Sequence, residues 1–169
     1  MLATTDTKDN LKTAFAGESQ ANRKYLAFSQ KAEKEGFPQV ARLFRAAAEA
    51  ETIHAFGHLA AMDAVGTTAD NLKAAVQGET YEYTEMYPPM LAQAQKEGHK
   101  ARTMFNWALK VEEVHADLYQ KALQAVGADK DLDQTEIFLC PVCGHLEIGK
   151  PAGKCRVCGL PPEKFRRMD

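Results

Sequence analysis

Two copies of the pattern Glu-x-x-His are the residues of this chain whose types and spacing point first to chemistry. The copies lie 61 residues apart, and each comes 33 residues after a lone glutamate. A Glu and a His three positions apart share one face of a helix, so each copy offers a carboxylate and an imidazole in one direction. Such groups are ligands for a metal ion. In chain order the six candidate ligands are Glu18, Glu51, His54, Glu79, Glu112 and His115.

The sequence around these ligands is repeated as well, which indicates two related halves. GESQANRKY is answered by GETYEYTEMY, and KEGFPQVARLFRAAAEAETIHA is answered by KEGHKARTMFNWALKVEEVHA. One glutamate breaks the symmetry, because Glu82 has Ala21 as its counterpart. Glu82 is therefore a seventh potential ligand that only the second half supplies.

The candidate glutamates lie where a helix bundle needs apolar side chains. Leu11, Phe15, Glu18, Asn22 and Tyr25 fall on one stripe at spacings of three and four residues. An ionised carboxylate in an apolar interior is costly unless it is paired or binds a metal. A Glu from each of two helices and a Glu-x-x-His from each of two others is the ligand set of di-iron and di-manganese bundles. The repeat therefore predicts a di-metal site.

Other side chains near the ligands have simpler explanations. A single Glu-x-x-His is common on a solvated helix face, and only its repetition behind a core-facing Glu favours a metal. His58 follows His54 by one turn and is expected to be packed or solvated. Tyr25 and Tyr87 lie two turns from their glutamates, and either fill the core or hydrogen-bond to the site.

The four cysteines of the chain all lie near its end, in two Cys-x-x-Cys-Gly motifs. This tail is too short to have a hydrophobic core of its own, so a metal must fold it. Zinc and iron both accept four sulfur ligands in a tetrahedron, and zinc would make a structural ribbon whereas iron would carry one electron. Iron is favoured, because an electron carrier can reduce a buried di-metal site and a redox-inert zinc ribbon cannot. The four ligands are Cys140, Cys143, Cys155 and Cys158.

Long helices must position the carboxylates. The stretch from Lys8 to Val126 is rich in Ala, Leu, Glu, Lys and Gln, and Gly36, Gly66, Gly98 and Gly127 each follow a segment of helical length. A short helix capped by Asp70 or Asn71 is expected in a connection long enough to cross the bundle, and Pro88 and Pro89 should kink or interrupt the third helix. The predicted long helices cover residues 7–35, 38–65, 79–97 and 99–126.

Composition and charge exclude several classes of protein. With 169 residues, 45% hydrophobic and 26% charged, the chain is globular rather than disordered. The formal charge of −2 argues against a nucleic-acid partner. We find neither a leader peptide nor an apolar run of membrane-spanning length, and expect a cytoplasmic protein without a membrane partner. The expected domains are a bundle over residues 1–127, a linker over 128–136 and a metal-binding tail over 137–169.

The combination resembles the rubrerythrin family, in which a ferritin-like di-iron domain precedes a rubredoxin-like domain. The segments GESQANRKY, GETYEYTEMYP, VEEVH and CPVCG carry the resemblance, which covers nearly the whole chain. It implies a mainly α fold, a ferritin-like four-helix bundle with a small C-terminal rubredoxin-like domain. It also implies that one iron takes Glu18 and either His54 or Glu82, the other takes Glu79 and His115, Glu51 and Glu112 bridge the two, and the cysteines hold a third iron.

The resemblance further implies an activity. Family members reduce hydrogen peroxide to water, with electrons drawn ultimately from NAD(P)H through a reductase or a separate rubredoxin. Some members also oxidise ferrous iron, so an iron-handling protein is the alternative enzyme class. A zinc-ribbon binding module on a helix bundle is the third possibility, but it leaves the buried carboxylates unexplained.

Two further expectations concern mechanism and assembly. Two irons about 3.5–4 Å apart can each supply one electron to a peroxide, and Glu82 is expected to replace neutral His54 on the oxidised pair, because a carboxylate offsets the added charge. The fourteen residues from Glu112 to Val126 carry the chain about 21 Å from the site. The tail's own iron then lies far away, so we expect a homodimer or higher oligomer with electron transfer between subunits.

Overall fold

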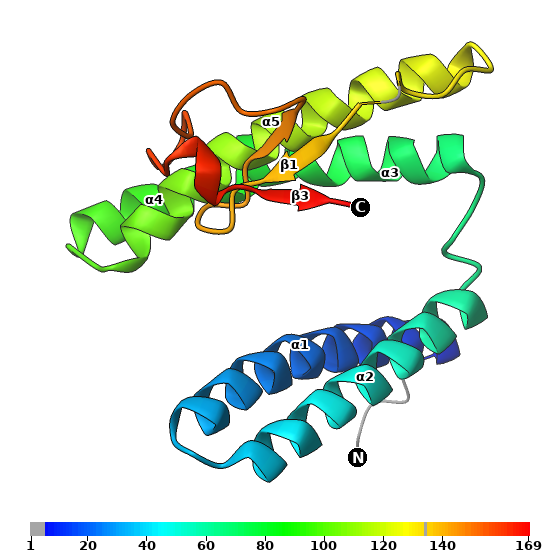
Figure 1. Ribbon diagram of the computed structural model, residues 1–169. Helices are drawn as coiled ribbons and strands as arrows, with labels where there is room; N and C mark the ends of the chain where they lie inside the picture. The colour runs from blue at the N-terminus through cyan, green and yellow to red at the C-terminus, as the bar shows by residue number, and fades with distance from the viewer. Residues whose placement is uncertain (1–5, 134) are drawn as a thin grey trace. The chain divides into compact units, whose positions relative to one another are not determined.

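The computed structural model describes residues 6–133 and 135–169. Residues 1–5 of the expected first domain and residue 134 of the expected linker lie outside the described residues. The chain divides into two compact units, Met1–Gly66 and Thr67–Asp169 (Figure 1). Each unit contains one half of the internal repeat, so each is described by itself.

The first unit is a pair of long antiparallel helices, α1 (Thr7–Lys34) and α2 (Pro38–Ala61), joined by a short turn. Asp6 caps α1 by accepting the N–H of Asp9 at 2.8 Å. Gly36 has a positive φ of 82° in the turn, as its place after the predicted helix requires. Pro38 occupies the first turn of α2, where its missing N–H has no helical partner to lose.

Small residues bring α1 and α2 close together. Ala41, Ala48 and Ala55 of α2 are all buried, and the spacing of seven places them on one face. Asn22 of α1 is also buried, and its Nδ2 donates to the carbonyl of Ala48 at 2.7 Å and to Oγ1 of Thr52 at 2.9 Å. The first unit is thus fixed by alanine packing and by the buried amide of Asn22, which joins the two helices.

The second unit begins with a helix that starts earlier than the sequence predicts. The expected connection with a cap at Asp70 or Asn71 is wrong, because α3 (Thr68–Tyr81) starts directly after Thr67. Oγ1 of Thr67 accepts the N–H of Asp70 at 3.2 Å and donates to its carboxylate at 2.6 Å, and this reciprocal cap opens the helix. Only residues 62–67 therefore separate α2 from α3, which is too short for the bundle-crossing connection that we expected.

The two prolines do not end this helix. A π-helical segment, Glu82–Met86, follows α3 and continues into α4 (Tyr87–Lys96), with the N–H of Tyr87 donating to the carbonyl of Glu82. Pro88 and Pro89 then lie in the first turn of α4. The interruption that we expected occurs just before the prolines, as one wide turn, and such turns are frequent at functional sites.

The long helix α5 (Ala101–Gly127) completes the helical part of the second unit. Its start is preceded by Gly98 with a φ of 65°, as predicted. The predicted left-handed residues Gly66 and Gly127 are wrong, because Asp63 (φ 50°) and Asp129 (φ 55°) take that conformation after α2 and α5. Aspartate adopts that conformation more readily than most residues with a side chain. The helix α2 ends earlier than predicted, at Ala61, whereas α5 ends at Gly127, within one residue of the prediction.

The tail forms a small antiparallel sheet with the strand order β2–β1–β3. Ile137 of β1 (Ile137–Leu139) pairs with Ile148 of β2 (Leu146–Ile148) and with Met168 of β3 (Arg166–Met168). A single 3₁₀ turn, Pro162–Lys164, precedes β3. The sheet lies beside α5 in Figure 1.

Val111 of α5 shares its hydrophobic core with the tail. Its side chain is 1% exposed and belongs to one cluster with three of the cysteines and Phe165. Trp107 of α5 packs against the same cluster. The metal-binding tail therefore has no separate core, as its length predicts, and it uses a helix of the second unit as its base.

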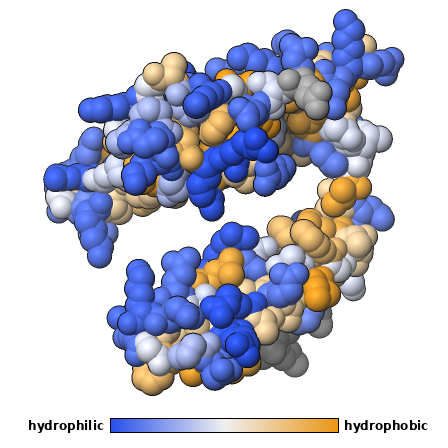
Figure 2. All heavy atoms as spheres, viewed as in Figure 1, coloured by the Kyte–Doolittle hydropathy of each residue, from blue (hydrophilic) through white to orange (hydrophobic). Residues whose placement is uncertain are grey.

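Within the described ranges, none of the helices is long and apolar enough to span a membrane. Apolar atoms are nevertheless visible on the surfaces of both units (Figure 2).

Candidate metal centres

Three predicted ligands meet in the first unit. Glu18 of α1 and Glu51 and His54 of α2 each offer a ligand atom within 4.8 Å of the others. Nδ1 of His54 lies 3.2 Å from Oε2 of Glu51 and 3.8 Å from Oε2 of Glu18. The side chain of His54 is 55% exposed, so this triad lies at the surface of its unit.

The two carboxyl groups of the first triad affect each other's pKa. Interaction with Glu51 raises the pKa of Glu18, whereas interaction with Glu18 and with His54 lowers the pKa of Glu51. Two carboxylates whose oxygens lie within 4.8 Å repel each other, and a cation between them would relieve that repulsion. The geometry thus suits a bound metal ion.

The repeat places an equivalent triad in the second unit. Glu79 of α3 and Glu112 and His115 of α5 again offer ligand atoms within 4.8 Å of one another. Nδ1 of His115 lies 2.8 Å from Oε2 of Glu112 and 3.9 Å from Oε1 of Glu79. The side chain of His115 is only 19% exposed.

In the second triad, burial and repulsion between like charges disfavour the ionised carboxylates. Burial raises the pKa of Glu79, and the charge of Glu112 raises it further. Burial lowers the pKa of His115, but the hydrogen bond and charge of Glu112 more than offset this, so the pKa is raised overall. A cation among these groups would relieve the repulsion between the carboxylates.

Glu82 and Tyr87 lie near the second triad. Burial and the charge of Glu112 raise the pKa of Glu82, and burial together with the carboxylates of Glu82 and Glu112 raises the pKa of Tyr87. Tyr25, by contrast, packs in an aromatic cluster of the first unit, with its ring centroid 6.1 Å from that of Phe44. Glu82 therefore lies close enough to Glu112 to feel its charge, but it is not among the residues whose ligand atoms meet within 4.8 Å in the second triad. Tyr25 has a packing role.

The four cysteines converge in the tail as free thiols. Their sulfur atoms lie within 4.8 Å of one another, with Cys140 and Cys158 separated by 3.5 Å and Cys143 and Cys155 by 3.6 Å. A metal–sulfur bond of about 2.3 Å gives tetrahedral sulfur spacings of about 3.8 Å. The donor set therefore fits a single tetrahedral ion.

Two equivalent backbone turns hold these sulfurs. The N–H of Gly144 donates to the carbonyl of Cys140, and the N–H of Gly159 donates to that of Cys155. Both glycines have positive φ values, 87° and 78°, which the turns require. Burial raises the pKa of the Cys143 thiol. A bound cation reverses this effect, because a coordinating thiol is deprotonated.

One hydrogen bond connects the cysteine site to the second triad. Nε2 of His115 lies 3.2 Å from the carbonyl oxygen of Gly144, which adjoins the ligand Cys143. When Nε2–H donates to that carbonyl, Nδ1 is left free toward Glu112 and Glu79, where a metal would bind. Metal-binding histidines usually fix their tautomer with such an outer hydrogen bond.

This contact corrects our expectation of a distant tail. We reasoned that α5 carries the chain away from the site, but the chain returns, and the tail packs on α5 at Val111. The cysteine site therefore lies beside His115 of its own chain. The distance argument for electron transfer between subunits is wrong.

Two features of this region were missed by sequence reasoning. The role of the Gly144 carbonyl depends on a tertiary contact, which residue types and spacing do not encode. His145 is 2% exposed, and its carbonyl accepts the N–H of Cys140 at 2.8 Å. Its position directly after the first cysteine motif was the available signal.

The fold and the metal ligands define a class of protein, a ferritin-like di-metal protein with a four-cysteine domain. The model of the Rubrerythrin family matches residues 9–123. The chain is 35% identical to rubrerythrin-2 of Clostridium acetobutylicum, over 95% of each chain, and 37% identical to nigerythrin of Nitratidesulfovibrio vulgaris, over 94% of this chain and 85% of that one. The structure of fully reduced, all-ferrous nigerythrin matches 99% of this chain and 92% of that chain, with 34% identity and a TM-score of 0.58.

This chain belongs to the rubrerythrin family. The predicted fold class is confirmed, and the cofactors are those of the family: a di-iron carboxylate centre and one iron held by four cysteines. The protein is an oxidoreductase with an iron-dependent, peroxide-related function that works with redox partners.

Proposed function

We propose that this protein is a peroxidase that reduces hydrogen peroxide to water at its di-iron centre. The balance is H₂O₂ + 2 H⁺ + 2 e⁻ → 2 H₂O. We assign the di-iron centre to Glu18, Glu51, His54, Glu79, Glu82, Glu112 and His115, within a ferritin-like part over residues 1–127. When bound, the two irons supply the electrons one each, which avoids release of a radical.

The observation that carries this proposal is the hydrogen bond between His115 and Gly144 at 3.2 Å. His115 is a proposed ligand of the di-iron centre, and Gly144 adjoins Cys143 of the four-cysteine site. The hydrogen bond therefore connects the two metal centres through few bonds. A structural zinc ribbon needs no such connection. An electron carrier at the four-cysteine site can use it to re-reduce the centre that has reacted with peroxide.

Protein groups near the second triad can hold and deliver protons. The hydroxyl of Tyr87 stays protonated, because burial and neighbouring carboxylates raise its pKa. Tyr87 is the proposed source of one of the protons that convert the peroxide oxygens to water.

We further propose that Glu82 replaces His54 as an iron ligand when the pair is oxidised. A carboxylate offsets the added positive charge, whereas a neutral imidazole does not. His54 is 55% exposed, while His115 is held from both ring nitrogens. Structures of Glu82→Ala in the reduced and oxidised states test this step. Unchanged iron positions and ligands in both states, with peroxide turnover equal to that of the parent, would contradict it.

Electrons enter at the tail in this scheme. Cys158 is the least buried of the four cysteines, so the iron site is reachable from the surface of the tail. A rubredoxin or an NAD(P)H-dependent reductase is the proposed donor. The physical requirement is a one-electron carrier that docks near Cys158.

The deciding experiment is an anaerobic peroxide titration. The protein is reconstituted with iron, fully reduced, and mixed with excess hydrogen peroxide, while the thiolate-to-iron absorption of the tail is followed. We expect rapid return of the colour with consumption of peroxide. In Glu112→Ala, which keeps the cysteine site, the colour should return slowly. Equal rates in the two proteins, or a reduced protein that ignores peroxide and reacts with oxygen, would favour the iron-handling alternative.

A further inference from the structure

His145 of the tail is the largest fully buried side chain among the described residues. Its imidazole is 2% exposed, and its Nε2 lies 3.6 Å from Oε2 of Glu147. Within residues 6–133 and 135–169, its Nδ1 has no hydrogen-bond partner. A buried polar atom without a partner costs free energy that an apolar side chain of similar size would not. Packing alone therefore does not explain a histidine at this position.

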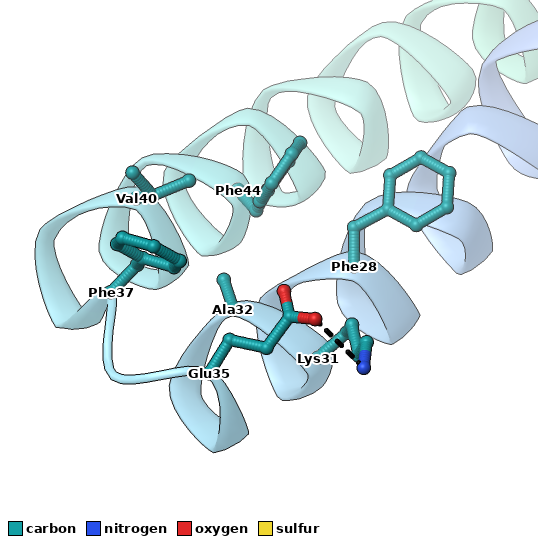
Figure 3. Close-up of a pocket in the computed structure, with 7 residues that line it drawn as sticks. All are labelled: Phe28, Lys31, Ala32, Glu35, Phe37, Val40 and Phe44. Atoms are coloured by element: carbon teal, nitrogen blue, oxygen red, sulfur yellow. Dashed lines mark ion pairs between the residues drawn. The ribbon is translucent and has the colours of Figure 1, made fainter.

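Other polar groups of the molecule have simpler explanations. At the apolar hollow between α1 and α2, the side chains of Lys31 and Glu35 are exposed and form an ion pair at the edge (Figure 3). Exposed pairs of this kind contribute little and need no further role. Asn22 leaves its Oδ1 unpartnered, but its Nδ2 donates two hydrogen bonds to α2. The imidazole of His145, by contrast, has only its contact with Glu147.

The backbone of His145 belongs to the four-cysteine site. Burial raises the pKa of the Cys143 thiol, and the N–H of His145, which donates to that sulfur, opposes the rise. The carbonyl of His145 accepts the N–H of Cys140 at 2.8 Å. Both backbone groups of this residue therefore contact metal-binding cysteines.

The peptide group between Gly144 and His145 has a contact at each end. Its N–H reaches the sulfur of Cys143, and its carbonyl oxygen lies 3.2 Å from Nε2 of His115. A peptide unit is planar, so its N–H and C=O point in opposite directions and turn together. One rigid group thus joins a proposed ligand of the di-iron centre to a ligand of the cysteine site.

Neighbouring side chains must hold this peptide group in its orientation, because Gly144 is free to turn. Its φ is 87°, a conformation that glycine adopts readily. From α5, Cγ1 of Val111 lies 3.7 Å from the position that a Cβ of Gly144 would take. The next residue, His145, is enclosed in the core and reaches Glu147 on β2. The imidazole is therefore an anchor directly beside the freely turning glycine.

Resting on the proposed transfer of electrons between the two centres, we infer that the imidazole of His145, held at Glu147, positions the Gly144–His145 peptide group for that transfer. His145 is a positioning residue, because it acts through the peptide group rather than on a reacting atom. With the ring in place, the N–H stays on Cys143 and the carbonyl stays on His115. Without it, Gly144 turns and the connection between the two centres is lost.

NMR of the zinc-loaded protein tests this inference without any peroxidase activity. Zinc occupies the four-cysteine site, and the exchange of the His115 Nε2–H with water is followed beside that of the tail amides. His145→Phe fills the core and removes both ring nitrogens. We expect slow exchange of the His115 Nε2–H in the parent and its loss in the variant, while the amides of β1 and β2 stay protected. Fast exchange in the parent, or slow exchange in the variant, would overturn the inference.

Glu147 offers a milder pair of variants, because its side chain is 40% exposed and its replacement opens no core. Glu147→Gln keeps an oxygen that accepts from Nε2 of His145, whereas Glu147→Leu keeps the approximate size and removes the acceptor. We expect the His115 Nε2–H to exchange as in the parent in Glu147→Gln, and as in His145→Phe in Glu147→Leu. Equal exchange in the two Glu147 variants would overturn the inference.

The matched control for a tail that is only loosened is Phe165→Leu. Phe165 is 9% exposed and lies in the same core cluster as three of the cysteines. Its replacement should weaken the protection of the tail amides and leave the His115 Nε2–H in slow exchange. If Phe165→Leu releases this hydrogen as His145→Phe does, general loosening explains the effect and the inference is overturned.

The iron-loaded protein separates this inference from the proposed function. After reduction and addition of peroxide, the tail of His145→Phe should regain its colour about tenfold more slowly than the parent, because loss of an outer hydrogen bond at a metal-binding histidine typically costs about 10–100-fold in activity. Phe165→Leu should regain it at the parent rate. A parent whose colour does not return contradicts the proposed function, whereas equal rates in His145→Phe and the parent overturn the positioning role.

Discussion

The two metal-binding triads come from the same sequence repeat, yet they lie in different surroundings. His54 is 55% exposed in the first unit, whereas His115 is 19% exposed in the second. In the second unit the tail packs on α5 and brings the Gly144 carbonyl to His115. Two symmetric half-sites thus become unequal through a segment that lies outside the repeat.

The inequality has a functional use. His115 is oriented through both ring nitrogens, by Glu112 on one side and by Gly144 on the other. A ligand held in this way stays in place, and its outer hydrogen bond leads toward the four-cysteine site. His54 of the first triad has its Nδ1 at 3.2 Å from Glu51. The second triad is therefore the one whose histidine is connected to the four-cysteine site.

The largest change in this comparison should follow removal of one cysteine. Cys155→Ser takes away a ligand of the only metal in the tail, and small metal sites fold with binding energies of about 10–16 kcal/mol. We expect residues 137–169 to lose their protection from hydrogen exchange, and His115 to lose its contact with the Gly144 carbonyl, while the helices persist. Zinc substitution in the parent is the control, since it removes the redox chemistry and should keep the tail protected. A protected, folded tail in the variant would contradict this prediction.

A smaller effect is expected at the base of the tail. Val111 is 1% exposed and packs in the core of the tail, so Val111→Ala should destabilise the attachment of the tail by about 2–3 kcal/mol through lost burial and a cavity. Hydrogen exchange at the amides of the tail measures the loss. The matched control is Val65→Ala, because Val65 is 67% exposed and its truncation should change stability by less than about 0.5 kcal/mol. Equal effects of the two substitutions would show that the tail does not depend on α5.

In the first unit, the buried amide of Asn22 joins the two helices. Asn22 donates two hydrogen bonds to α2, to Ala48 and Thr52, and Tyr83 stands at its repeat position. Asn22→Ala should therefore destabilise the α1–α2 pair by about 1–2 kcal/mol and leave the tail unaffected. Hydrogen exchange resolved by segment measures this effect. Gln20→Ala, an exposed site on the same helix, is the control. Loss of protection in the tail, with unchanged protection in α1 and α2, would contradict this prediction.

Sequence reasoning recovered the parts of the molecule that repeat and missed those that depend on tertiary contact. The spacing of Glu51 and His54 and the Cys-x-x-Cys motifs suffice to predict which ligands meet, because a helix turn and a knuckle are local geometries. The start of α3 at Thr68 was missed, since the Thr67–Asp70 cap competes with equally plausible caps nearby. The contact between His115 and Gly144 was missed for a deeper reason, because nothing local indicates that the chain returns to α5 after Gly127.

The smallest expected effect is a change in the pKa of His115, measured in the iron-free protein. Burial lowers the pKa of His115 but Glu112 more than compensates, so the folded pKa lies above the ordinary value of 6.5. A raised folded pKa means that protonated His115 contributes stability below pH 6.5, and that this contribution is lost as the pH rises through the folded value. Glu112→Gln removes the main source of the increase and should lower the His115 pKa, which NMR of the imidazole ring measures.

The control for this titration is Glu113→Gln, which removes the same charge one residue away at an exposed position. It should leave the His115 titration close to that of the parent, because the hydrogen bond of 2.8 Å comes from Glu112 alone. The charge of Glu112 also raises the pKa of Glu79, so the titration of Glu79 is followed beside that of His115. If both substitutions lower the His115 pKa equally, general surface charge sets it, and the second triad is not distinguished by its own hydrogen bond.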